Sequence, residues 1–493
     1  MPLRTSTGVR STMDRIAAIA PGPKLAYFMY ASFILLCTTL AVYTETWEIA
    51  AAPIAIVAAV LVIKDIRILY YGFFALLPFS VEVEVGPLGT DLPSEPMMLA
   101  LTGVGILLFI QHFKSISSRY LTHPITLLLL LHLVWLLVTS IFSLTPVYSF
   151  KFFVAKIWYV IPFYFLGFYM LSKHKDIHQM FRLIGIFLTV AVCIVLTRHA
   201  LLGFTFDTSN TVVYPIFRNH VSYAAIIVTV LPYMWVLWVT ERKKWQLLCI
   251  AILVVGTYFS YTRAAHLCIF IMMGAYFVFK YNFGKIAISA SLILAILLGS
   301  YMLSNNNFLR FAPDFDKTIT HDNFENLVEA TYKLEDISTM ERVYRWVAGG
   351  YMIGRSPVLG CGPGGFYHNY TKHTVTSFET YVSDNPEKSG IHCYYLMTWV
   401  EQGTPGFLIF LALCIVILLY GERTFRATRS VAAQRIVMAA TLSTVSICAL
   451  CLINDLIETD KVGPFFFINA AIIVLYDLKS RAGTSAKQIE ASS

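Results

Sequence analysis

Charged side chains are scarce in this sequence. Only 13% of its 493 residues are charged, whereas 57% are hydrophobic; soluble domains average about 25% charged and about 45–50% apolar residues. The deficit excludes an ordinary soluble domain and indicates a polytopic membrane protein. The net charge of +8 does not indicate nucleic-acid binding, because the basic residues gather at the ends of hydrophobic segments and form no stripe interleaved with aromatic residues.

Signals for a metal centre, a nucleotide site and an internal repeat are also missing. The nine cysteines show no metal-ligand spacing, and seven of them lie in hydrophobic segments, where cysteine is a small apolar side chain. Cys361 and Cys393 lie in a polar stretch and form either a disulfide or two free thiols. The glycine-rich run 360–365 has no Gly-Lys-Ser/Thr after it, which favours a tight turn over a phosphate loop.

Long hydrophobic segments fill most of the sequence. A helix needs about 20 apolar residues to cross a bilayer, and the sequence predicts an all-α membrane protein with about twelve to fourteen transmembrane helices. The candidate segments are 25–43, 48–63, 68–81, 97–113, 122–143, 150–171, 183–202, 221–239, 246–260, 264–279, 286–303, 394–420, 432–453 and 464–477.

The loops between these segments alternate in charge. Basic residues resist translocation and so mark the cytoplasmic side, and every second loop is basic whereas the others are acidic or neutral. This pattern predicts five regions: a cytoplasmic N-terminal tail over 1–24, about eleven transmembrane helices over 25–303, a large external insert over 304–393, about three transmembrane helices over 394–477 and a cytoplasmic C-terminal tail over 478–493. The first hydrophobic segment is expected to stay as an anchor.

The external insert is the longest polar interruption of the chain. Residues 324–336 have the pattern of a surface helix, and a second helix is expected from Ser338 to Ile353, with Glu341 completing a capping box. A conducting or transporting protein has little need for such an insert with arginines, glycines and a histidine. The insert therefore favours chemistry at the membrane surface.

Several basic residues on the external side are not needed for orientation. These are Arg218, His220, Arg263, Arg342, Arg345 and His392. Each one alone could reach lipid headgroups, and Arg345 could pair with Glu341 one turn away. As a set they suit an anion, since guanidinium groups bind phosphates through two parallel hydrogen bonds. A neutral imidazole at His392 could take a proton from an acceptor hydroxyl, or could instead cap the next helix.

Acidic residues offer a different interpretation of the same side. Asp91 with Glu95, or Asp455 with Glu458, could hold a divalent cation, because carboxylates are suitable ligands for hard metals. Ordinary solvated acidic loops are the alternative that the sequence favours, and no metal or other cofactor is expected.

Three short patterns resemble the O-antigen ligase family, which includes O-antigen polymerases and bacterial protein O-oligosaccharyltransferases. The first is Thr262-Arg263-Ala-Ala after a hydrophobic segment. The second is Arg342-Val-Tyr-Arg-Trp346 followed by the run from Arg355 to Gly364. The third is His392 followed by Leu396, Glu401, Gly403 and Gly406. Thr262 stands where the family usually has serine, and Cys393 stands where asparagine commonly follows the histidine.

The resemblance implies a GT-C-like membrane glycosyltransferase in the bacterial inner membrane, with its active site facing the periplasm and no metal requirement. Its donor would be a glycan linked to undecaprenyl diphosphate, bound by Arg263 and Arg342 with Arg218 and Arg345 as further candidates. His392 would be the general base, with His220 as the secondary candidate. The first expectation is the ligase reaction on a lipid A core. Polymerase activity and protein glycosylation are alternatives, and a lipid-linked oligosaccharide flippase is the alternative from another class.

Overall fold

The computed structural model describes residues 23–44, 65–85, 88–112, 117–311, 337–374 and 390–492. The chain divides into two units, residues 1–70 and 71–493, and the first contains helix α2 (Pro23–Thr44). The sites described below lie in the second unit. The expected segment at 48–63 and the surface helix at 324–336 lie outside the described residues.

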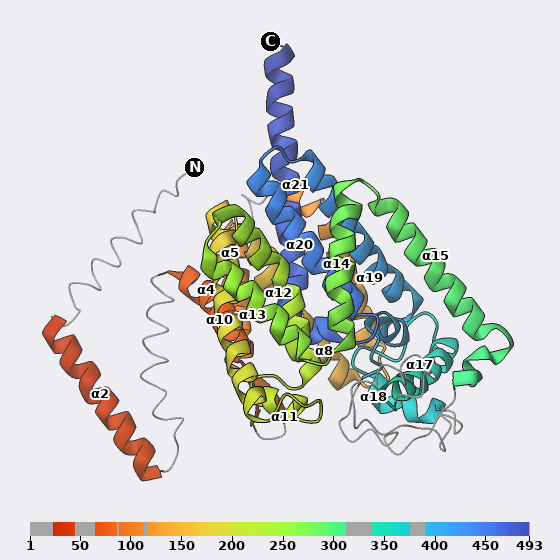
Figure 1. The fold of residues 1–493 in the computed structure, drawn as a ribbon, viewed down its shortest axis with the longest axis horizontal. Helices are drawn as coiled ribbons and strands as arrows, with labels where there is room; N and C mark the ends of the chain where they lie inside the picture. Colours follow the sequence, from red (N-terminus) through yellow and green to blue (C-terminus); the bar gives the residue numbers. More distant parts are fainter. Residues whose placement is uncertain are drawn as a thin grey trace. The chain divides into compact units, whose positions relative to one another are not determined.

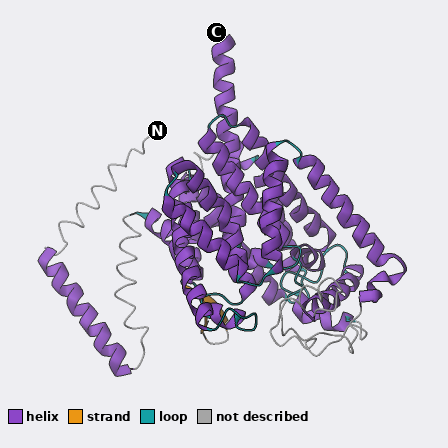
Figure 2. Cartoon of the chain, in the orientation of Figure 1, coloured by secondary structure: helices purple, strands orange, loops and turns teal. Residues whose placement is uncertain are grey.

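Helices make up nearly all of the described structure, as Figure 2 shows. After α4 (Ile66–Leu76), the chain forms α5 (Ser94–His112), α6 (Ser118–Leu121), α7 (Pro124–Ile141), α8 (Pro146–Val160), α9 (Gly167–Met170), α10 (His174–Leu201), α11 (Ser209–Val213), α12 (His220–Glu241), α13 (Lys244–Tyr258), α14 (Arg263–Lys280), α15 (Gly284–Leu303), α17 (Ile337–Arg355), α18 (Phe366–Asn369), α19 (Tyr394–Ala427), α20 (Val431–Leu450) and α21 (Gly463–Ser492).

Ten helical segments among the described residues are long and apolar enough to cross a membrane, and three further apolar helices are shorter. The prediction of an all-α polytopic membrane protein is confirmed. The two segments expected at 68–81 and 246–260 correspond to short helices, Ile66–Phe79 and Lys244–Tyr258. The helix expected at 338–353 is also confirmed, since α17 runs from Ile337 to Arg355.

One departure from the expected helices is a β-hairpin. Strand β1 (Val81–Val85) pairs antiparallel with β2 (Leu88–Leu92), with Glu82 opposite Asp91. The alternation of charge between the loops predicts only an acidic loop here. The alternation Val-Glu-Val-Glu-Val is a strand pattern, so the signal was present in the sequence.

Helices α12, α20 and α21 are the most buried of the spanning segments. A closed set of hydrogen bonds joins them: the Tyr233 hydroxyl donates to Asn469 Oδ1 at 2.6 Å, the Asn469 amide donates to Ser443 Oγ at 3.0 Å, and the Ser443 hydroxyl donates to the Tyr233 oxygen at 2.9 Å. Each group is thereby satisfied away from water, which buried polar groups require. This bond set fixes the three central helices against one another.

The insert helices lie at one end of the helical bundle. Figure 1 shows α11, α17 and α18 at this end and the C-terminal part of α21 at the opposite end. We call the first the insert end. Helix α7 connects the two ends, because it starts next to His123, which contacts Asp477 of α21, and finishes near Ser143, whose hydroxyl donates to the Cys361 carbonyl at 3.3 Å.

Candidate active site

His392 occupies a turn that immediately precedes α19 at the insert end. Its φ is +56°, a left-handed conformation that is uncommon for a residue with a side chain. The main-chain N–H of His392 donates to Asp455 Oδ2 at 3.0 Å. A Cβ atom at Gly390 would lie 2.5 Å from the same oxygen, so glycine lets the turn approach the carboxylate closely. The loop between α20 and α21 therefore shapes the backbone of His392.

Two consecutive side chains of α17 hold the other side of this turn. Arg345 Nη1 donates to the Gly390 carbonyl at 3.2 Å, and Trp346 Nε1 donates to the Ile391 carbonyl at 3.0 Å. Arg345 is only 3% exposed, and Ile391 is fully buried. Arg345 thus contacts the main chain beside His392. The side chain of Glu341, its expected partner, lies outside the described residues.

Arg342 connects His392 electrostatically with a second histidine. The positive charge of Arg342 acts on both His392 and His220. Burial lowers the pKa of His392 to about 3, and the charges of Arg345 and Arg342 act in the same direction. The imidazole is therefore uncharged at neutral pH, the form that can accept a proton.

His220 begins α12 and is fixed by a single amide oxygen. Asn210 Oδ1 accepts both the main-chain N–H of His220, at 3.1 Å, and the ring Nδ1, at 2.7 Å. Because this oxygen only accepts hydrogen bonds, the Nδ1 atom carries the ring proton and the Nε2 atom keeps its lone pair. His220 is thus also held in a form that can accept a proton.

Arg263 belongs to the segment that contacts His220. It is the first residue of α14, and the hydroxyl of Thr262 before it donates to the His220 carbonyl at 3.3 Å. Arg218 lies elsewhere on this surface: its Nε atom is 3.9 Å from Glu82 Oε2 of β1, and both side chains are more than half exposed. The structure therefore brings His220 next to the Arg263 segment and pairs Arg218 with the hairpin.

The glycine-rich run 360–365 forms the tight turn that the sequence favoured. Gly360, Gly362 and Gly364 all have positive φ values. The turn packs against α19, where the N–H groups of Cys361 and Gly362 donate to the carbonyls of Val400 and Glu401 at 3.0 and 2.9 Å. A Cβ atom at Gly362 would lie 1.9 Å from Ser143 Oγ. The turn is thus packed against protein on two sides.

This packing explains the pattern Glu401-x-Gly403 in α19. Gly403 has a φ of +67° and interrupts the helix, and Pro405 has no N–H to donate to the Glu401 carbonyl. The glycine-rich turn supplies the missing donor through Gly362, and Trp135 Nε1 of α7 donates to the Gln402 carbonyl at 2.8 Å. The buried Glu401 side chain accepts the Phe366 N–H at 3.1 Å. These contacts therefore hold the first part of α19, the helix that follows His392 in the chain.

A buried lysine near the site was missed by the sequence interpretation. Lys156 of α8 forms an ion pair with Glu458 and donates to the Tyr394 hydroxyl at 2.9 Å, and Tyr394 also donates to Glu458. Tyr394 begins α19 two residues after His392. A lysine inside an apolar segment is costly without a partner, and this signal could have identified Lys156, although not Glu458 as its partner.

The acidic residues of this end contact protein groups, so the expectation of solvated acidic loops was wrong for several of them. Asp455 binds His392, Glu458 pairs with Lys156, and Glu95 accepts the Thr90 hydroxyl at 2.6 Å. Burial, with the nearby charge of Asp460, raises the pKa of Asp91 to about 7. In the part of the chain that the structure describes, no three His, Cys, Asp or Glu side chains are grouped as metal ligands would be.

Cys361 and Cys393 are free thiols. Burial raises the pKa of both, that of Cys393 to about 11. Both cysteines are therefore protonated and poorly reactive at neutral pH.

Residues 247–411 match a protein-family model described as O-antigen ligase. The matched region runs from α13 to the middle of α19 and contains Arg263, Arg342, Arg345 and His392, whereas Arg218, His220 and Asp455 lie outside it. No curated protein matches the chain.

Proposed function

Since residues 247–411 match the O-antigen ligase family model, we propose that this chain transfers a glycan from an undecaprenyl-diphosphate-linked donor to an acceptor hydroxyl, with a lipid A core as the acceptor. The family supports a membrane glycosyltransferase of the ligase or polymerase type. The observation that carries the finer proposal is the turn of His392 at the insert end, which Asp455 and Arg345 hold and where burial lowers the pKa of the imidazole. The charge of Arg342 acts on the same imidazole.

The proposed reaction is a displacement at the anomeric carbon of the donor. The acceptor oxygen forms the new bond to this carbon while His392 takes the hydroxyl proton. The bond from the carbon to the diphosphate oxygen breaks, and undecaprenyl diphosphate leaves with the electron pair. Arg342 and Arg263 would stabilise the negative charge on the leaving group, as preorganised positive charges do in many active sites. His220 is the second candidate for the base.

Arg218 and Arg345 have weaker support as diphosphate ligands. Arg345 is buried and donates to the Gly390 carbonyl, and Arg218 lies beside Glu82. We propose that Arg345 positions the histidine turn and that Arg218 contacts the donor only at its periphery. The periplasmic location of the insert end, the inner membrane and the GT-C-like class remain parts of the proposal.

A labelled donor and purified protein test the reaction class. A transferase releases undecaprenyl diphosphate and labels the acceptor, whereas a flippase moves the donor intact across the membrane. Adding lipid A core in one reaction and only a second lipid-linked glycan in another separates a ligase from a polymerase. A peptide acceptor tests protein glycosylation. Movement of intact donor without release of undecaprenyl diphosphate would contradict the proposal.

A pair of arginine variants tests the diphosphate contact. Arg342→Lys keeps the charge but loses the planar fork of the guanidinium, so transfer should fall by at least about tenfold. Arg355→Lys is the matched control, because Arg355 is exposed at the other end of α17. Equal activity of the two variants would remove Arg342 from the proposed donor site.

A further inference from the structure

A pocket of about 400 Å³ lies at the end of the bundle opposite to His392. Its lining residues come from α6, α9, the start of α7 and the end of the α21 membrane segment. The pocket includes His123, which immediately precedes α7, whereas the other end of α7 lies near the insert end. The full length of α7 therefore separates the pocket from the insert end. Sites for small ligands typically measure about 300–1,000 Å³.

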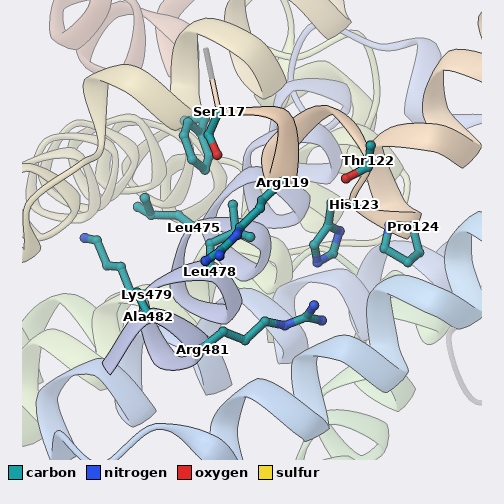
Figure 3. Close-up of a pocket in the computed structure, with 11 residues that line it drawn as sticks. Ser117, Arg119, Thr122, His123, Pro124, Leu475, Leu478, Lys479, Arg481 and Ala482 are labelled. Carbon is teal, nitrogen blue, oxygen red and sulfur yellow. The ribbon is translucent and has the colours of Figure 1, made fainter. Parts of the chain in front are cut away.

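The lining is basic. Figure 3 shows Arg119 of α6 extending over Leu478 of α21, with Lys479 and Arg481 on either side in this view. Hydroxyl groups of Ser117 and Thr122 add hydrogen-bonding capacity. None of the described lining residues is acidic. A ligand in this pocket would therefore lie among three positively charged side chains, Arg119, Lys479 and Arg481.

Among the described residues, two carboxylates offset part of this charge, Asp477 and Asp176. Asp477 accepts from Arg481 Nη2 at 2.7 Å and lies 3.3 Å from His123 Nε2. Arg423 also acts on Asp477 electrostatically. Lys479 donates one hydrogen bond to the Ser172 carbonyl, and the charge of Asp176 acts on it. The cations Arg119, Lys479, Arg481 and Arg423 thus outnumber these two carboxylates. The surroundings of the pocket therefore keep a positive charge that a bound anion would balance.

The floor of the pocket is apolar. Phe168, Leu475 and Leu478 line it beside the basic groups, and the α21 membrane segment ends at Ala482. A membrane lipid matches this lining, because its phosphate can lie against the basic side chains and its acyl chain against the apolar ones. We propose that the pocket binds the phosphate headgroup of an anionic membrane lipid.

Binding can be measured on the purified full-length protein by native mass spectrometry. The probes are phosphatidylglycerol, the neutral-headgroup lipid phosphatidylcholine, and inorganic phosphate. One phosphatidylglycerol should bind preferentially, and Arg119→Gln, which removes a charge-assisted contact to phosphate, should weaken it by about tenfold or more. Arg426→Gln is the matched control, because Arg426 is an exposed arginine in the last turn of α19, at the same end but outside the pocket.

Three outcomes would overturn the proposal. Equal weakening by Arg119→Gln and Arg426→Gln would show that the basic residues attract anionic lipid only through the general charge of this end. Equally tight binding of inorganic phosphate would assign the pocket to a free anion. Equal binding of the two lipids would remove the role of the headgroup charge. The measurement reads binding and not transfer, so its result is independent of the proposed glycosyltransferase activity.

Discussion

Asp455 accepts a hydrogen bond from the main-chain N–H of His392 at 3.0 Å. The two residues are 63 positions apart, and the carboxylate stabilises a left-handed backbone at a residue that would ordinarily avoid it. This contact links the loop between α20 and α21 to the residue that we propose as the base. Several predictions test the network around it.

Asp455→Ala should lower the rate of glycan transfer by about tenfold or more while leaving the KM for the donor nearly unchanged, because a hydrogen bond to a charged group is worth about 1.5–3 kcal/mol. Asp455→Asn keeps one acceptor oxygen and should retain more activity. Steady-state kinetics with a labelled donor provide both parameters. A normal rate in Asp455→Ala would show that His392 does not need this support.

Replacing Gly403 should destabilise the protein. Its φ is +67°, and a Cβ atom would lie 2.0 Å from the Val358 carbonyl oxygen, so Gly403→Ala should cost on the order of 3 kcal/mol or more. Gly274→Ala in α14 is the control, because nothing lies within 4 Å of its added Cβ atom. Thermal unfolding in detergent compares the two. A Gly403→Ala variant as stable as Gly274→Ala would contradict the described break in α19.

The Lys156–Glu458 pair predicts non-additive effects on stability. Lys156→Met leaves the carboxylate of Glu458 without its cation and should lower the free energy of unfolding by about 3 kcal/mol. The double variant Lys156→Met, Glu458→Met removes both charges and should be more stable than Lys156→Met alone. Both residues are largely buried. The midpoints of thermal unfolding measure the cycle. Strictly additive losses would show that the two charges do not interact.

Asp91 predicts a pH dependence of stability. Burial raises its pKa from 3.8 to about 7 in the folded protein, so the folded state holds this proton more tightly than the unfolded state. The contribution of Asp91 to the free energy of unfolding is therefore fully present below pH 4 and is lost as the pH rises through 7. Asp91→Asn cannot ionise, and its unfolding temperature should exceed that of the unchanged protein at pH 8.

The difference in unfolding temperature between Asp91→Asn and the unchanged protein should shrink from pH 8 to pH 5, because the folded protein takes up a proton at Asp91 in this range whereas the unfolded chain does so only near pH 4. Asp207→Asn, at an exposed aspartate, is the control and should show no such change with pH. A constant difference between Asp91→Asn and the unchanged protein from pH 5 to pH 8 would place Asp91 in a solvated setting.

Local patterns in the sequence predicted the helices and the insert turn well. The pattern around Ser338 predicted a helix that matches α17 to within two residues at each end, although Ser338 lies inside this helix, and the glycines of the run 360–365 predicted a turn. Both signals depend on neighbouring residues. The hairpin β1–β2 was also visible as an alternating pattern, although the sequence interpretation did not use it.

The contacts that shape the site could not be predicted in this way. The bonds from Asp455 to His392 and from Lys156 to Glu458 join residues 63 and 302 positions apart, and no local pattern identifies such partners. The break at Gly403 did have a local signal in Gly403-Thr-Pro405-Gly406, but the prediction of a single membrane segment over 394–420 did not use it. Burial of Asp455 and Arg345 by the surrounding helices decides their roles, and burial depends on the whole fold.

The most direct test of the central claim compares two replacements of His392 in the labelled-donor transfer assay. His392→Ala removes the imidazole, and His392→Gly removes it while also relieving the left-handed backbone at φ +56°. General-base catalysis contributes about 10²–10⁴-fold, so both variants should lose transfer by this factor while still binding the donor. Recovery of normal transfer in His392→Gly would show that position 392 serves only the turn, and it would contradict the assignment of His392 as the base.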